Sequence, residues 1–155
     1  MKMEFVEYWA IYSGDDRLFY EQAKLLHEKE KPYFVIISDE KPRFIVGVYF
    51  NYEGYFCSVD YLNQDLEKER TEAYVVHNQQ LFLKNVHEFY YDGREVDLET
   101  YLYEIDGRYR KNFFSRGTET KAPEYGTCDV SSHFREMIHY DSILPEEAKR
   151  GLGEG

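Results

Sequence analysis

Short apolar runs separated by turn residues recur along this chain and predict antiparallel strands. The runs YFVIIS (33–38), RFIVGVYFN (43–51) and YFCSVDYL (55–62) are rich in β-branched and aromatic residues. The segment DEKP and a turn at Glu53-Gly54 separate them. In residues 43–51 both alternating sets of side chains are largely apolar, which is typical of a strand that is buried on both faces. We therefore predict a meander in which 43–51 is a central strand.

Further strands are expected on either side of this meander. Residues 3–12 predict an opening strand, and AYVVH and LFLKNVHEFYY predict a hairpin that turns at 78–80. The run RYRKNFF (108–114) predicts an edge strand, because its basic side chains suit a solvent-exposed edge. The segment 63–72 is interpreted as a charged connector or a short helix, and 117–126 as a loop.

Two segments predict helices at opposite ends of the chain. Over residues 17–30 an apolar face repeats with helical spacing after a capping aspartate, and Pro32 marks the stop. The run VSSHFREMIHY (130–140) predicts a short second helix.

The segment 97–106 also favours a helix, with Asp97 as the N-cap and Gly107 after the last turn. A strand is the alternative, but continued alternation would place Glu104 and Asp106 on the same face as apolar side chains. The spacing i, i+3, i+4 and i+7 that favours the helix is formed by Leu98, Tyr101, Leu102 and Ile105.

The order of strand, helix, hairpin strands and short helices predicts an α+β domain. We expect an antiparallel sheet of five to seven strands, with an early helix and short C-terminal helices packed on it. The pair Asp92-Gly93 is a hairpin signal within that sheet. The length of 155 residues predicts a single domain over 1–150, followed by a disordered tail at 151–155.

The net charge of −11 is unevenly distributed. Residues 108–121 hold five basic residues against one acid, a local charge of +4, so the other residues carry −15. Such a surface repels nucleic acid and anionic membranes and attracts a basic partner, unless the acidity only maintains solubility. The basic stretch itself could hold single-stranded nucleic acid, with Phe113 and Phe114 as stacking platforms, but it would act against the field of its own protein.

The N-terminus and the cysteines favour a soluble cytoplasmic protein. Glu4 and Glu7 fall where a signal peptide would need its apolar core, and nowhere do 18 apolar residues run together. Cys57 and Cys128 are too few for a disulfide framework, so we expect two reduced thiols.

No motif in the chain predicts catalysis, a metal or a cofactor. The sequence contains no H-E-x-x-H, G-x-S-x-G, G-x-G-x-x-G or P-loop pattern. The best enzyme candidate is Cys128 near a predicted helix start with His133 beyond it, and His77 and His87 are further candidates in a cleft of the sheet. We expect no catalytic residues and no cofactor.

Tyrosines beside carboxylates are the most distinctive chemical feature, since the chain holds 16 Tyr and 30 Asp and Glu residues. Tyrosine combines a large rigid contact area with one hydroxyl and is enriched in binding surfaces. We predict that these pairs are exposed in turns and helix ends, where they bind a basic protein partner. The predicted partner-binding residues are Tyr52, Glu53, Tyr55, Asp60, Asp65, Glu67, Asp92, Asp97, Glu99, Tyr101, Tyr103, Glu104 and Asp106.

In size, acidity, α+β pattern and lack of active-site motifs, the chain resembles the small bacterial immunity proteins that neutralise a cognate basic toxin, such as a nuclease. No alignable motif carries the resemblance, so it assigns a role to no residue. It implies a stoichiometric inhibitor that occludes the active site of the toxin, without binding nucleic acid or membrane. The alternative is a small enzyme or ligand-binding domain.

Overall fold

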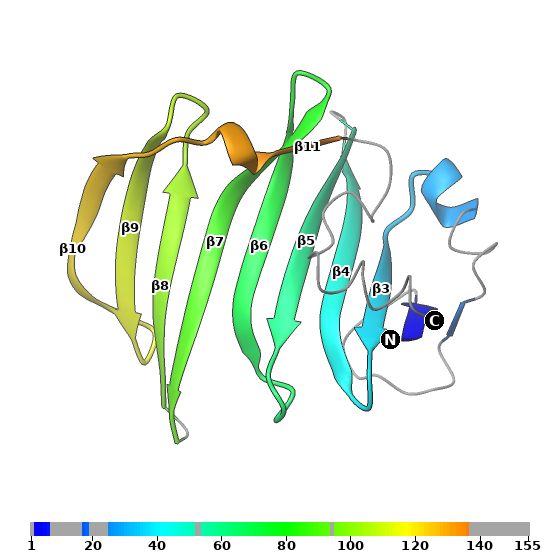
Figure 1. The fold of residues 1–155 in the computed structure, drawn as a ribbon, viewed down its shortest axis with the longest axis horizontal. Coiled ribbons are helices and arrows are strands. Elements are labelled where there is room, and N and C mark those ends of the chain that lie inside the picture. Colours follow the sequence, from blue (N-terminus) through cyan, green and yellow to red (C-terminus); the bar gives the residue numbers. More distant parts are fainter. Residues whose placement is uncertain (1, 7–16, 19–24, 52–53, 94, 137–155) are drawn as a thin grey trace.

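The protein folds into one continuous antiparallel sheet, in which β3 to β10 follow one another as a meander (Figure 1). The computed structural model describes residues 2–6, 17–18, 25–51, 54–93 and 95–136. Across the sheet the strand order is β10-β9-β8-β7-β6-β5-β4-β3-β1-β2, and β11 pairs with β7. The strands are Lys2–Val6 (β1), Arg17–Leu18 (β2), Tyr33–Ser38 (β3), Pro42–Asn51 (β4), Gly54–Leu62 (β5), Lys68–His77 (β6), Gln80–Asp92 (β7), Glu95–Tyr103 (β8), Arg108–Ser115 (β9), Thr118–Thr127 (β10) and Phe134–Glu136 (β11), and a 3-10 turn, η1, covers Ser131–His133.

The predicted α+β class with five to seven strands is therefore wrong. The described residues form an 11-stranded sheet, and their helical content is limited to residues 25–28 and η1. The predicted helix over 17–30 overlaps strand β2 at its start, and 19–24 lies outside the described residues, as do 7–12 of the predicted opening strand and the predicted tail at 151–155. Within the described ranges no helix has the length and apolar character needed to cross a membrane.

The segment 97–106, predicted as a helix, is most of strand β8 followed by a turn at 104–107. Two backbone hydrogen bonds of 2.8 and 3.0 Å close this turn. Because the strand ends at Tyr103, Glu104 and Asp106 leave the sheet and do not share a face with its apolar residues. Strands β7 and β9 supply hydrogen-bond partners on both sides of β8, and this pairing overrides the local helical spacing.

Four further predictions fail, wholly or in part, for the same reason. Residues 63–72 form the β5–β6 turn and the start of β6, and 117–126 form most of β10. The predicted edge strand 108–114 is therefore covered by β10 and lies inside the sheet. The predicted helix over 130–140 is η1 and β11 up to residue 136, and 137–140 lies outside the described part. In each case a neighbouring strand supplies the hydrogen bonds that the local composition does not reveal.

The predicted meander is confirmed. Strand β4 pairs with β3 on one side and β5 on the other, so 43–51 is an interior strand. The β6–β7 hairpin turns at Asn78 and Gln79, whose φ angles are 48° and 62°. Positive φ at both central residues is the type I′ pattern that matches the twist of the flanking strands. Gly93, with a φ of 62°, lies in the β7–β8 turn that the Asp-Gly pair predicts.

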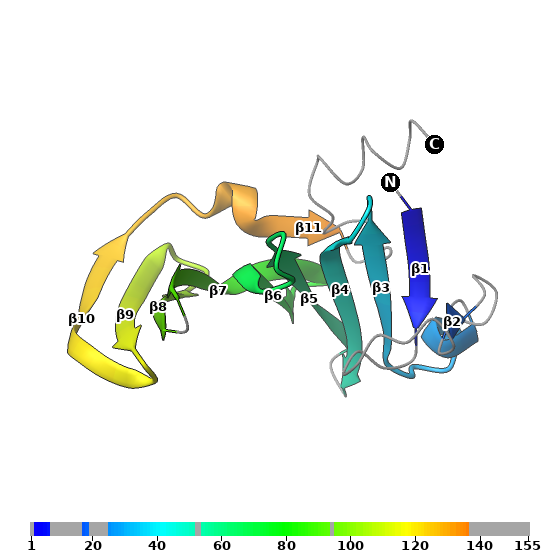
Figure 2. The same cartoon turned by 90° about the horizontal axis from the view of Figure 1, so that it is seen from below.

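The sheet curls along its width, and the chain leaving β10 crosses back over the inside of the curl (Figure 2). The Cys128 N–H donates to the Gly107 carbonyl at 2.8 Å, and this bond fastens the return segment, residues 128–136, to the β8–β9 turn. Further along, the ring of His133 lies 4.6 Å from the ring of Tyr103. The face that bears Tyr103 is therefore the concave face.

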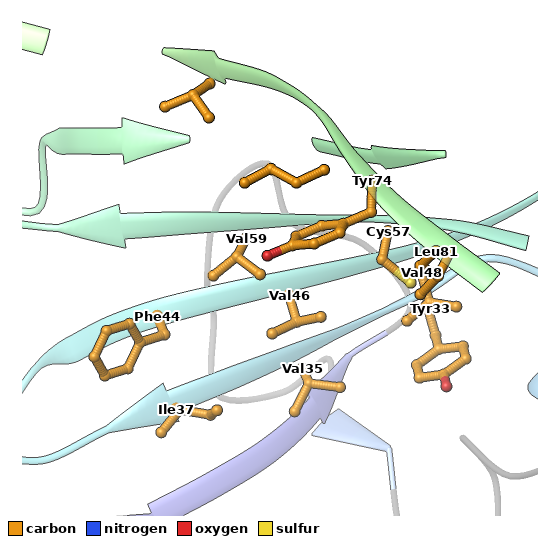
Figure 3. Packing of buried hydrophobic residues seen from close by; sticks show 12 residues of the cluster. Tyr33, Val35, Ile37, Phe44, Val46, Val48, Cys57, Val59, Tyr74 and Leu81 are labelled. Atoms are coloured by element: carbon orange, nitrogen blue, oxygen red, sulfur yellow. The ribbon is translucent and has the colours of Figure 1, made fainter. Parts of the chain in front are cut away.

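The concave face changes from apolar to polar across the sheet. Over β3, β4 and β5 it carries the main core, in which Val35, Val46 and Cys57 have no exposed surface (Figure 3). Toward β6 to β9 the same face carries charged and aromatic side chains. Cross-strand register shows the change along one row of neighbours, which runs from β4 to β9 through Phe44, Tyr61, Arg70, Glu88, Glu99 and Phe113.

Amide hydrogen exchange should distinguish the interior of the sheet from its edge. We expect the amides of residues 44–48 to be among the slowest, because their side chains are buried and both neighbouring strands are paired. The amides of β10 should exchange much faster, because that strand is an edge with mostly exposed side chains. Similar rates in 44–48 and β10, measured by NMR on the native protein, would contradict the interior position of β4.

Candidate functional site

Three of the predicted partner-binding carboxylates gather at one end of the sheet, where the β5–β6 and β7–β8 turns lie (Figure 1). The same end of the sheet carries two exposed side chains with large apolar surface, Leu66 and Tyr91, which are 49% and 38% exposed. The Tyr91 hydroxyl donates to a backbone carbonyl of β6 at 2.8 Å and so ties the two turns together. Neither Asp65 nor Asp92 forms an ion pair with a described residue. We name Asp65, Leu66, Glu67, Tyr91 and Asp92 the turn surface.

Two other predicted carboxylates lie at the opposite end of the sheet, because successive turns of a meander alternate between its ends. Glu104 and Asp106 belong to the β8–β9 turn. Glu104 pairs with Lys84 at 3.1 Å, and Asp106 pairs with Arg108 at 2.7 Å. The structure therefore divides the predicted binding residues between two ends, and at this second end they are matched by cations.

Several other predicted partner-binding residues do not contribute side chains to either group of turns. Tyr52 and Glu53 lie outside the described residues, and only the backbone of Tyr55, in β5, is described. Asp60 is half-buried on β5 and accepts a hydrogen bond of 2.7 Å from the Thr71 hydroxyl. The Asp60 carboxylate therefore already has a hydrogen-bond donor within the protein.

Tyr101 and Tyr103 lie on the concave face and are half-buried, not exposed as predicted. Their rings are stacked, with centroids 6.1 Å apart. The Lys111 ammonium lies 5.1 Å from the Tyr101 ring centroid and 3.1 Å from the Glu99 carboxylate. Hydrogen bonding to Tyr101 and then to Glu99 raises the pKa of Lys111. Glu99 and both tyrosines thus belong to an internal network that a partner could reach only in part.

The sequence interpretation missed a second network on the same face, centred on Arg70. Its guanidinium lies 3.0 Å from Glu72, which is 8% exposed, and also pairs with Glu88. The Tyr61 hydroxyl donates to Glu72 at 2.5 Å. Burial, followed by this hydrogen bond, raises the pKa of Tyr61. The only sequence signal was the alternation of Arg70 and Glu72 within a segment interpreted as a connector.

A groove opens on the concave face where β7, β8 and β9 meet the curled edge of β10. Two register shifts in β10, around Lys121, bend that strand so that the Lys121 ammonium lies 3.8 Å from the Phe113 ring centroid. The groove has a volume of about 370 Å³. We name it the aromatic groove, and its lining residues are Tyr90, Asp97, Leu98, Glu99, Phe113, Phe114, Ser115 and Thr120.

Phe113 and Phe114, the candidate stacking platforms of the basic stretch 108–121, have different surroundings. The Phe113 ring is approached by two ammonium groups, those of Lys111 at 4.8 Å and Lys121 at 3.8 Å. Phe114 is half-buried. The Phe113 ring is therefore already in contact with cations of the protein itself.

The two cysteines have different environments. Cys57 has no exposed surface, and burial raises the pKa of its thiol to about 12. Cys128 is exposed at the start of the return segment. His133 lies further along it, with Nδ1 3.2 Å from the Leu83 carbonyl oxygen. No hydrogen bond joins Cys128 to His133 in the described part of the chain, so the geometry of an activated thiol is not formed here.

The remaining histidine candidates lie far apart. His77 lies opposite Gln80 at the β6–β7 turn, whereas His87 lies opposite Thr71 near the other end of β6. Six residues along a strand separate these positions by about 20 Å. Burial, and then the nearby Lys68 ammonium, lowers the pKa of His87. Among the residues described, no three His, Cys, Asp or Glu side chains are grouped to hold a metal ion.

Comparison with known proteins gave no match. No family model matches the chain, and neither a curated protein nor a solved structure is significantly similar to it.

Proposed function

We propose that this protein is an acidic protein-binding module that docks on a basic partner, in the manner of an inhibitor that occludes the active site of a cognate toxin such as a nuclease. The observation that carries the proposal is the turn surface, where exposed Leu66 and Tyr91 lie among carboxylates. Apolar and tyrosine side chains supply contact area that excludes water, and a surrounding ring of charge selects the sign of the partner.

The charge distribution supports docking through this end of the sheet. Asp65 and Asp92 have no cation partner among the described residues, whereas Glu104 and Asp106 at the other end are paired. Unpaired exposed carboxylates project a stronger negative field than paired ones. A basic protein approaching a chain of net charge −11 is therefore steered toward the turn surface.

Association kinetics test this proposal with a basic protein encoded beside the gene for this chain as the first partner. The association rate constant should fall steeply as salt rises, because exposed charges are screened over about 8 Å at physiological ionic strength. The dissociation rate should change much less. Stopped-flow fluorescence over a series of salt concentrations measures both rates.

A pair of double variants then locates the docking end. Asp65→Lys with Glu67→Lys and Glu104→Lys with Asp106→Lys change the net charge equally, but at opposite ends of the sheet. We expect the first pair to lower the association rate on the order of tenfold, and the second to lower it much less. Binding that ignores salt and both double variants would contradict the proposal, as would failure to bind any basic neighbour-encoded protein.

A further inference from the structure

The aromatic groove has the size and position of a site for one protruding side chain. Its volume of about 370 Å³ lies at the lower end of the range for ligand pockets. Its floor is formed by three adjacent strands, through Tyr90 of β7, Glu99 of β8 and Phe113 of β9. Thr120 of β10 lines its side. A site built on paired strands holds its side chains in fixed relative positions.

The charge of the groove favours a cation. Asp97 is exposed and accepts one hydrogen bond, of 2.7 Å, from the Ser115 hydroxyl. It forms no ion pair with any residue that the structure describes. The nearby cations are already engaged, since Lys111 pairs with Glu99 at 3.1 Å and Lys121 lies 3.5 Å from Glu124. One carboxylate of the groove is therefore left for a ligand.

The aromatic side chains of the groove add a flat surface for that cation. Tyr90 is 51% exposed, and it lies directly opposite Asp97 in the β7–β8 ladder. Directly opposed residues have Cβ atoms about 4.5–5.5 Å apart, so a planar cation over the Tyr90 ring reaches the carboxylate. The protein itself places two ammonium groups over the neighbouring Phe113 ring. A cation over the Tyr90 ring would therefore make the same kind of cation–π contact that two lysines of the protein make with Phe113.

An additional sign of negative potential comes from the Tyr90 hydroxyl. Partial burial, and then the carboxylates of Glu99 and Glu88, raises the pKa of Tyr90. Those carboxylates would stabilise a positive group at the same place.

We propose that the aromatic groove binds an arginine side chain of the basic partner, with the guanidinium stacked on Tyr90 and hydrogen-bonded to Asp97. Arginine fits better than lysine because its guanidinium is planar, stacks on aromatic rings and presents parallel N–H donors to a carboxylate. The inference rests on the proposed function in that the partner is basic, and it names the group by which that partner is anchored.

Small-molecule probes test the groove without the partner. L-argininamide should shift the backbone amide signals of residues 97–99 and 113–115 in ¹H–¹⁵N spectra, with saturation in the millimolar range. L-lysinamide carries the same side-chain charge without the planar group. L-citrullinamide keeps the planar shape of the side chain without the side-chain charge. Both should bind at least about threefold more weakly. Equal affinity of argininamide and lysinamide, or shifts located elsewhere, would overturn the assignment.

Matched variants test the two named residues. Asp97→Asn should weaken argininamide binding about two- to fivefold, whereas Asp129→Asn, which removes the same charge from an exposed position in the return segment, should leave it nearly unchanged. Tyr90→Ala should weaken it by a similar factor, with Tyr125→Ala as the control for loss of an exposed tyrosine. Equal effects within either pair would contradict a groove-specific site.

The partner experiments separate failure of this inference from failure of the proposed function. If the partner associates in a salt-dependent manner and Asp97→Asn leaves its dissociation rate unchanged, the groove is not the anchor although the proposed function stands. If no basic partner binds, the proposed function fails and the argininamide titration alone decides the groove. If Asp97→Asn raises the dissociation rate, the partner's arginines are then replaced one at a time. One of these replacements should raise the dissociation rate from the unaltered protein but not from the Asp97→Asn variant.

Discussion

Replacement of Gly107 by alanine is expected to lower the free energy of unfolding by about 2–6 kcal/mol. Gly107 has a φ of 92°, a left-handed conformation that costs an L-residue about 1–3 kcal/mol. A Cβ atom at this position would also lie 2.3 Å from the Cys128 carbonyl oxygen, so the return segment would have to move. Overpacking of this kind costs about 1–3 kcal/mol more.

Gly117→Ala is the matched control for this prediction. Gly117 has a φ of 80°, but no atom lies within 4 Å of the position where a Cβ would be placed. The control should therefore show only the conformational cost, and urea unfolding of both variants gives the difference. In Gly107→Ala alone, the Cys128 amide should also exchange faster, because its hydrogen bond to Gly107 is strained. Equal losses in the two variants would contradict tight packing of the return segment on the β8–β9 turn.

Replacement of Arg70 by methionine is expected to be the second most destabilising of these changes. Glu72 lies between Val59 and Val86 in the ladder and is 8% exposed. Without the guanidinium its charge is buried, and among the described residues the Tyr61 hydroxyl is the one partner that remains. Breaking a buried ion pair costs about 3–5 kcal/mol. Because the Arg70 side chain is 35% exposed, solvent screening reduces this, and we expect a loss of about 2–3 kcal/mol at pH 7.

The pH dependence of this loss identifies its cause. In the Arg70→Met protein the Glu72 carboxylate is buried without a cation, and protonation at low pH removes that unpaired charge. Because a buried, unpaired carboxylate destabilises the folded state only while it is charged, stability is lost as pH rises from about 4 to about 7. The deficit relative to the unaltered protein should therefore be smallest near pH 4 and largest near pH 7.

Two further variants complete the test of the Arg70 network. Arg116→Met removes a guanidinium from an ion pair with Glu95 in which both side chains are more than half exposed, and it should cost less than about 1 kcal/mol. Adding Glu72→Gln to Arg70→Met removes the stranded charge and should recover part of the stability at pH 7. A deficit that does not vary with pH and is not relieved by Glu72→Gln would show that lost packing, not the unpaired carboxylate, is responsible.

The hairpins at the centre of the chain could be predicted from the sequence because their signals are local. Residues 43–51 alternate apolar side chains on both faces. Asn78 and Gln79 both have a positive φ in the β6–β7 turn, and Gly93 has one in the β7–β8 turn. Each of these signals is contained within a few neighbouring residues of the sequence. The acidic character of the surface likewise follows from composition alone.

The strands β8 and β10 could not be predicted in this way. Residues 97–106 carry both a helical spacing and strand-forming residues, and the choice depends on whether β7 and β9 are in place to accept hydrogen bonds. Residues 117–126 include Pro123 and are mostly polar, and they form a strand because β9 lies beside them. The predicted helices and edge fail at these points because strand pairing joins residues that are distant along the chain.

The features of the candidate site also divide into those that the sequence determines and those that depend on the tertiary structure. The sequence by itself determined that tyrosines and carboxylates adjoin, that the protein is acidic, and that a meander of hairpins carries them. Only the tertiary structure decided that Asp65 and Asp92 share one end of the sheet while Asp106 lies at the other, and that Tyr90 lies opposite Asp97 over a groove. The reason is that cross-strand register and the curl of β10 are set by hydrogen bonds between strands, and a shift of one residue would send each of these side chains to the other face.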